Sequence, residues 1–321
     1  MTLKFNILTE LKDGPWGGGN QFLKLLKKEA KNRNKYSDIE NADIILFNGH
    51  HDLYKALDVK EKYPEKIFIH RIDGPMDYRG KKGKKLDKKI FFLNDLIADG
   101  TIFQSYWSCG ENIKSFMIEN FAIIHNAPDP DIFYKKKNTS KLLDGKIKLV
   151  AVSWSTNPLK GFDIYQLLDE KLDFNRYEMS FVGNSNVNFC NIKTYPAMNS
   201  GDLADFLRTQ DVFVFASKRE ACSNSLLEAI HCGLPCLVRD CSSNREIMKS
   251  NGLAFNSENI FEKLDKLTLD LTSSNSDGEV TRIDEICDQY LNFFSKIKQN
   301  YQAKKINNKI IYKFRIKFGL V

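Results

Sequence analysis

Residues 217–235 read Ser217-Lys-Arg-Glu220-Ala-Cys-Ser-Asn-Ser-Leu-Leu-Glu228-Ala-Ile-His-Cys-Gly-Leu-Pro235, and they directly follow the apolar run 212–215. The apolar residues after Ser223 recur at helical spacing, and Gly-Leu-Pro ends the pattern. The sequence therefore predicts a buried strand and then a helix whose N-terminus lies at the carboxyl end of that strand. The first N–H groups of such a helix carry partial positive charge, which suits a diphosphate.

Strands and helices alternate in both directions from this stretch. Short β-branched or aromatic runs, typical of parallel strands buried on both faces, occur at 3–8, 42–47, 66–69, 100–103, 121–124, 146–152, 177–182, 211–215, 235–238 and 253–255. Helical patterns lie near 22–30, 161–170, 201–208, 222–232, 243–250, 258–270 and 281–300. The sequence predicts an α/β protein of two doubly wound, Rossmann-like domains with a cleft between them.

The length of 321 residues is about twice the commonest domain size. Residues 126–145 contain prolines and the run Lys-Lys-Lys-Asn-Thr-Ser without periodicity, so we place the interdomain linker there. We predict an N-terminal domain at 1–140, a C-terminal domain at 141–295 and a basic C-terminal segment at 296–321. Residues 271–280 are interpreted as a surface loop.

The net charge of +7 is unevenly distributed. Residues 141–295 are acidic overall, whereas residues 296–321 hold eight Lys or Arg and no acid, and a second basic run at 79–89 is interpreted as a loop. The simplest interpretation is a solvated surface, and the alternative is an anionic membrane surface. Nucleic acid is not expected, because no binding motif is present and the acidic middle would repel phosphate.

Seven cysteines, no basic-then-apolar leader and no apolar run of about 18 residues indicate a cytoplasmic protein, with the inner face of the membrane as a further location. Cys232 and Cys236 have no second pair, and Asp129 and Asp131 lie in the linker. We therefore expect no metal site.

Glu220 and Glu228 flank the start of the helix predicted after Ser223. Carboxylates at these positions reach different parts of an elongated ligand and accept hydrogen bonds from vicinal hydroxyl groups. The alternative is that neither carboxylate of this pair binds a ligand, and that one interacts with the helix dipole while the other is a surface residue.

Glu220, seven intervening residues, Glu228 and the following Cys-Gly-Leu-Pro resemble the donor-site signature of the retaining nucleotide-sugar glycosyltransferases of family 4, which have the GT-B fold. Similar segments cover nearly the whole chain. They are the glycine turn Gly14-Pro-Trp-Gly-Gly-Gly-Asn-Gln-Phe-Leu23, the histidine segment Ile69-His70-Arg-Ile-Asp-Gly-Pro75, the interdomain turn at 124–133 and the phosphate-binding Pro158-Leu-Lys160-Gly161. The resemblance also implies that residues 296–321 return to the N-terminal domain.

By this resemblance Lys160 neutralises the donor diphosphate, and the two glutamates hold the donor sugar and the nucleotide ribose. The catalytic residues it implies are His70, Lys160 and Glu220. The donor-binding residues are Gly18, Gly19, Ser155, Lys160, Glu220, Ser223, Asn224, Ser225 and Glu228. On the acceptor side we expect Asp73, His51 and Asn20.

One departure from the family pattern is Trp154, which stands where the family usually has an arginine that grips the diphosphate. Ser153, Ser155, backbone N–H groups and Arg219 are candidates for replacing that charge.

The resemblance implies a retaining, metal-independent transfer of a sugar from a UDP- or GDP-linked donor to a hydroxyl group, with the leaving phosphate taking the acceptor proton. The expected acceptor is a glycan or a lipid-linked glycan in polysaccharide assembly, and no cofactor is expected. The alternatives are a sugar-nucleotide epimerase or hydrolase, and a nucleotide-sugar-binding subunit that Trp154 has weakened as a catalyst.

Overall fold

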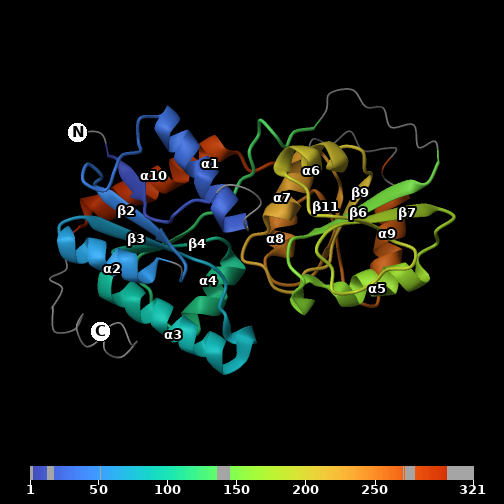
Figure 1. Ribbon diagram of the computed structural model, residues 1–321, viewed down its shortest axis with the longest axis horizontal. Coiled ribbons are helices and arrows are strands. Elements are labelled where there is room, and N and C mark those ends of the chain that lie inside the picture. The colour runs from blue at the N-terminus through green and yellow to red at the C-terminus, as the bar shows by residue number, and fades with distance from the viewer. Residues whose placement is uncertain are drawn as a thin grey trace.

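Two α/β domains lie side by side in the computed structural model (Figure 1). The structure describes residues 3–12, 18–50, 52–135, 145–269, 271 and 279–301. His51, residues 14–17 of the glycine turn, the expected boundary at 140 and 141, and residues 302–321 of the basic segment lie outside the described residues. None of the helices in the described ranges is long and apolar enough to span a bilayer.

The N-terminal domain is built on a five-stranded sheet in the order β1-β2-β3-β4-β5, with every pair parallel. Its strands are β1 (Phe5–Ile7), β2 (Ile44–Asn48), β3 (Ile67–Ile72), β4 (Gly100–Phe103) and β5 (Phe121–Ile123). Its helices are α1 (Gly18–Asn32), α2 (Leu53–Lys62), α3 (Gly80–Ile97) and α4 (Tyr106–Ile113), and a short 3-10 turn, η1 (Asp77–Arg79), precedes α3. Every residue of β2 and β3 is buried, which explains their nearly continuous apolar sequences.

The C-terminal domain has a six-stranded sheet in the order β11-β10-β9-β6-β7-β8, again parallel throughout. Its strands are β6 (Ile147–Ser153), β7 (Tyr177–Gly183), β8 (Lys193–Tyr195), β9 (Val212–Phe215), β10 (Cys236–Arg239) and β11 (Gly252–Phe255). Its helices are η2 (Pro158–Lys160), α5 (Phe162–Lys171), α6 (Ser200–Leu207), α7 (Asn224–His231), α8 (Asn244–Met248) and α9 (Ile260–Leu269). The chain order reverses between β6 and β9, so this is the point where such sheets bind ligands.

The predicted fold class and strands are confirmed, with one omission. Strand β8 lies at the sheet edge and is largely exposed, so Lys-Thr-Tyr carries no apolar pattern that would reveal it.

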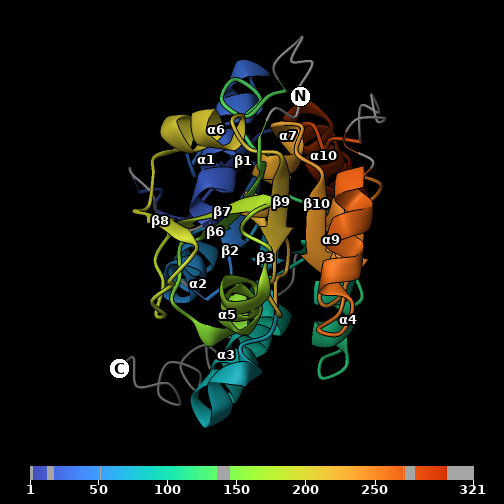
Figure 2. The ribbon, with the colours of Figure 1, turned by 90° about the vertical axis from the view of Figure 1, so that its right-hand side faces the viewer.

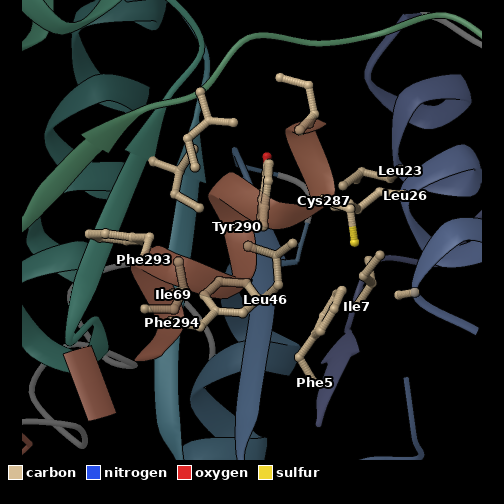
Figure 3. Close-up of a cluster of buried hydrophobic side chains, with 14 of the residues drawn as sticks. Phe5, Ile7, Leu23, Leu26, Leu46, Ile69, Cys287, Tyr290, Phe293 and Phe294 are labelled. Carbon is tan, nitrogen blue, oxygen red and sulfur yellow. The ribbon is translucent and has the colours of Figure 1, made fainter. Parts of the chain in front are cut away.

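The last described helix, α10 (Ile283–Gln299), lies on the N-terminal domain and corrects our boundary, because we had placed residues 283–295 in the C-terminal domain. Its buried residues recur at three- and four-residue spacing and meet the apolar face of the first sheet (Figure 3). The Phe294 ring lies 5.1 Å from Phe5, and Tyr290 lies 6.1 Å from Phe22. The chain therefore crosses back before residue 283 and not at 296.

The basic run at 79–89 is helical and not the loop that we expected. Gly83, Asp87 and Ile90 face inward at helical spacing, and the lysines between them face solvent. The spacing of apolar residues could not predict this helix, because the run consists mainly of Lys and Gly and only a narrow stripe of the helix is apolar.

Candidate active site

A cavity of about 390 Å³ opens between the two domains, a size typical of small-molecule sites. Its N-terminal wall comes from the start of α1 and the segment after β3, and includes Gly18, Asp73 and Tyr78. Its C-terminal wall comes from the ends of β6, β7 and β9 and from α7.

Gly161 brings η2 against the end of β9. Its φ is +87°, and a Cβ at this position would lie 2.1 Å from the carbonyl oxygen of Ala216. Only glycine fits this left-handed conformation and this close approach. The approach places Lys160 beside the β9–α7 loop.

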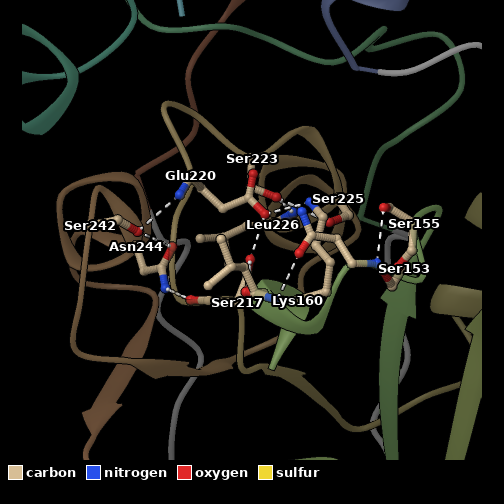
Figure 4. Close-up of polar contacts among 12 residues, drawn as sticks. Ser153, Ser155, Lys160, Ser217, Glu220, Ser223, Ser225, Leu226, Ser242 and Asn244 are labelled. Atoms are coloured by element: carbon tan, nitrogen blue, oxygen red, sulfur yellow. Dashed lines mark hydrogen bonds and ion pairs between the residues drawn. The ribbon is translucent and has the colours of Figure 1, made fainter. Parts of the chain in front are cut away.

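Lys160 and Glu220, which the family resemblance assigned to the donor site, are in contact in the cavity wall (Figure 4). Lys160 Nζ lies 2.6 Å from Glu220 Oε1, and Ser217 Oγ donates to the same oxygen at 2.6 Å. Two further hydroxyls hold the Glu220 backbone, since its N–H donates to Ser242 Oγ and its carbonyl accepts from Ser243 Oγ. The glutamate therefore keeps the lysine ammonium next to the N-terminus of α7.

Glu228 lies within α7 and lines the same cavity. Among the described residues, its carboxylate has no hydrogen-bond or ion-pair partner, and burial raises its pKa to about 7. A carboxylate in this state offers open acceptor sites to hydroxyl groups of a ligand.

The polar residues at the start of α7 have different roles. Ser223 is the N-cap, and its Oγ accepts from the N–H of Leu226 at 3.4 Å and lies 3.1 Å from Ser225 Oγ. Asn224 joins the domains, because its Nδ2 donates to the Gly18 carbonyl at 2.8 Å and its Oδ1 accepts from Asn126 at 2.8 Å. All three expected residues, Ser223, Asn224 and Ser225, line the cavity.

Ser155 and Asn20 do not line the cavity, contrary to our expectation. Ser155 is used locally, since its Oγ accepts from the N–H of Asn157 at 3.2 Å; Ser153 lines the cavity instead. Asn20 forms two hydrogen bonds with the backbone of Lys12, at 2.8 and 2.9 Å. Gly18 and Gly19 line the wall as expected.

His70 is buried inside β3 and does not line the cavity, so the structure does not support it as a residue that touches substrate. Its Nδ1 accepts from Asn94 at 3.2 Å, so its Nε2–H donates to the Gly49 carbonyl at 2.9 Å. Its ring stacks 4.1 Å from Phe47, and burial lowers its pKa to about 4. This neutral imidazole is part of the core.

Asp73, three residues further on, does lie at the cavity, in the wall that the N-terminal domain supplies. Gln104 donates to its carboxylate, and the fully buried Arg71 lies 3.4 Å away. Arg71 also donates to Asn48 and Asn126, both at 2.6 Å. Arg71 was not among the residues predicted from the sequence, although a cation in a short, mainly apolar strand was a signal for it.

Trp154 and Arg219 both line the cavity. The Trp154 residue is 49% exposed. Arg219 donates to Asp77 of the N-terminal domain at 2.6 Å, and its guanidinium lies over the rings of Tyr78 and Trp107. The cation proposed as a replacement for the missing arginine therefore bridges the two domains.

In the described part of the chain, no three His, Cys, Asp or Glu residues gather where they could hold a metal ion. Asp129 and Asp131 instead pair with Lys28, at 3.4 and 2.8 Å.

Residues 189–276 match the family model described as Glycosyl transferases group 1. The match includes Glu220 and Glu228, and it supports glycosyltransferase as the enzyme class. No curated protein matches the chain in sequence.

The two domains together have the GT-B fold, because solved GT-B structures superpose on nearly the whole chain. Sucrose-phosphate synthase from Thermosynechococcus elongatus superposes with a TM-score of 0.73 at 12% identity, over 93% of this chain and 100% of that one. HepE of Anabaena, solved in complex with UDP-glucose, superposes with a TM-score of 0.67 at 14% identity, over 93% of this chain and 99% of that one. The lipopolysaccharide outer core galactosyltransferase WaaB superposes with a TM-score of 0.58 at 14% identity, over 94% of this chain and 99% of that one.

Proposed function

We propose that this protein transfers a sugar from a nucleotide diphosphate sugar to a hydroxyl group of an acceptor bound at the N-terminal wall of the cleft, with retention of configuration and without a metal ion or cofactor. One observation carries the proposal: the Lys160–Glu220 ion pair and the Glu228 carboxylate, which has no partner among the described residues, line the same cavity at the start of α7.

Each part of the donor has a matching group in the C-terminal wall. The diphosphate meets the Lys160 ammonium and the first N–H groups of α7, which stabilise the negative charge that develops as the glycosidic bond breaks. Vicinal hydroxyls of the ribose donate to Glu228. Glu220 is held beside Lys160 and accepts from hydroxyls of the donor sugar.

Retention is proposed to follow from the leaving phosphate, which takes the proton of the attacking acceptor hydroxyl on the face where the new bond forms. Glu220 then needs no nucleophilic role, in line with its engagement by Lys160 and Ser217. Asp73, which lines the opposite wall, is proposed to orient the acceptor hydroxyl.

UDP-sugars are the first donors to test, with GDP-sugars next, because HepE was solved with UDP-glucose on the same fold. A glycan acceptor is proposed, and the galactosyltransferase of the lipopolysaccharide outer core shows that the fold serves such acceptors in another protein.

The test is thermal stability with UDP-, GDP-, CMP- and dTDP-sugars in the absence of metal, on wild type and on Glu228→Gln. A donor present at 100 times its dissociation constant stabilises the folded protein by about 2.7 kcal/mol. Hydroxyl donors favour the ionised carboxylate, so wild-type affinity rises with pH below 7, by up to about tenfold per unit. In Glu228→Gln both the affinity and this pH dependence are reduced.

Glu258→Gln is the matched control, because Glu258 is an exposed residue of the same domain outside the cavity. The stabilising donor is then incubated with glycan acceptors. A new glycoside with the donor's anomeric configuration supports the proposal. Donor binding that yields only free sugar or an epimerised nucleotide sugar contradicts it. The proposal is also contradicted if the donor raises the thermal stability of Glu228→Gln as much as that of wild type.

A further inference from the structure

Helix α3 carries five exposed lysines in its first turns: Lys81, Lys82, Lys84, Lys85 and Lys88. In the described parts of the chain, none of these ammonium groups forms an ion pair with an acidic side chain. Four of them, Lys81, Lys84, Lys85 and Lys88, are separated by three or four residues and therefore lie on one side of the helix. We call these four residues the lysine face.

The lysine face is unfavourable for the helix itself. Like charges three and four residues apart repel each other, and cations near a helix N-terminus oppose the helix dipole. The first turn holds no acidic residue, and the cap residue Arg79 makes no side-chain capping bond. An external anion would relieve both penalties, so the arrangement favours a negatively charged partner.

Exposed apolar side chains continue this surface. Phe92 lies one turn beyond Lys88 and is 37% exposed. The Phe91 ring stacks on Phe116 at 3.6 Å, which places the segment after α4 beside α3, and there Met117 is 90% exposed. Cations next to protruding apolar groups suit the interface of an anionic bilayer, where both kinds of side chain are satisfied.

The lysine face is fixed rigidly to the cleft wall. A Cβ on Gly83 would lie 1.8 Å from the carbonyl oxygen of Met76, and the Met76 N–H donates to Asp87 at 2.8 Å. Met76 itself lines the cavity. Figure 2 shows α3 at the lower edge of the molecule, extending away from the sheets.

We propose that the lysine face, with Phe92 and Met117 beside it, docks this protein on an anionic lipid bilayer and holds the mouth of the cleft at the membrane surface. This inference goes beyond the proposed transfer and does not depend on it.

The test is sedimentation of the full chain with phosphatidylcholine vesicles that contain about one third phosphatidylglycerol, compared with vesicles of phosphatidylcholine alone. Wild type binds the anionic vesicles and is released as NaCl rises from 0.1 to 1 M, since the Debye length falls from about 10 to 3 Å. Each Lys→Gln change in the lysine face lowers the partition coefficient about fivefold, and the quadruple variant loses on the order of 600-fold.

The matched control removes the same charge from four exposed lysines of the C-terminal domain that form no ion pair among the described residues, namely Lys146, Lys148, Lys171 and Lys266. This control variant keeps vesicle binding. Met117→Ser lowers vesicle partition but leaves retention on a soluble polyanion such as heparin unchanged. The proposal is overturned if wild type does not bind anionic vesicles, or if both quadruple variants bind them equally. It is also overturned if Met117→Ser does not change vesicle binding while heparin binding depends on the lysine face.

Discussion

His70 is a titratable side chain whose surroundings remove it from the chemistry of the cleft. Its two ring nitrogens and one ring face are all occupied inside the N-terminal sheet. The pKa of about 4 means that the folded protein keeps this imidazole neutral at pH values where the unfolded chain is protonated. Stability therefore falls as pH drops from 6.5 towards 4, by up to about 3 kcal/mol from this group.

Replacement of His70 is expected to change stability and not catalysis. His70→Ala removes two hydrogen bonds and a ring contact, so urea denaturation at pH 7.5 should show a loss of about 2–4 kcal/mol. The kcat of the folded fraction should stay within about twofold of wild type. His70→Gln, which cannot be protonated, should show a smaller loss of stability between pH 6.5 and 4 than wild type, because the contribution of this imidazole is removed. A large fall in kcat with unchanged stability would restore His70 to the active site.

At the scale of elements, helix α8 of the C-terminal domain caps helix α4 of the N-terminal domain. The Glu246 carboxylate accepts from the backbone N–H groups of Tyr106 at 2.8 Å and Trp107 at 3.4 Å. The same carboxylate lies 2.7 Å from His125 Nε2 in the interdomain turn. The first N–H groups of a helix need such an acceptor, and here the partner comes from the other domain.

Glu246→Ala is expected to loosen the closed arrangement of the two domains. Loss of the cap and of the His125 contact should lower the free energy of unfolding by about 1–3 kcal/mol. Small-angle X-ray scattering should show a larger radius of gyration than wild type. Glu262→Ala, an exposed glutamate on α9, serves as the control and should change neither value. An unchanged scattering curve for Glu246→Ala would mean that other contacts, such as Arg219–Asp77, hold the domains.

At the scale of the molecule, the chain passes from the first domain to the second and then returns, so the N-terminal core is completed by α10. Phe5 and Leu23 lie near the start of the described chain and α10 lies near its end, yet they share one cluster (Figure 3). Folding of the N-terminal domain therefore depends on residues that are synthesised after the C-terminal domain.

Phe294→Ala is expected to destabilise the N-terminal domain by about 3–5 kcal/mol, because it leaves a cavity in this cluster. Tryptophan fluorescence can follow each domain separately in variants that retain only Trp107 or only Trp154. The urea midpoint should fall for the Trp107 reporter and stay nearly constant for Trp154. Phe181→Ala, in the core of the C-terminal domain, should do the reverse. Equal shifts at both reporters would mean that the domains unfold as one unit.

The sequence by itself determined the parallel strands other than β8, and helix α7. These features depend on local periodicity and on the rule that strand ends and helix N-termini share one edge of a sheet. The family resemblance of the sequence placed Lys160 and Glu220 in one site, and the structure shows that they are in contact. Only the tertiary structure decided that His70 faces the core, that Asn224 binds Gly18, and that α10 belongs to the first domain. Those outcomes depend on which distant surface each side chain packs against, and no local pattern encodes that choice.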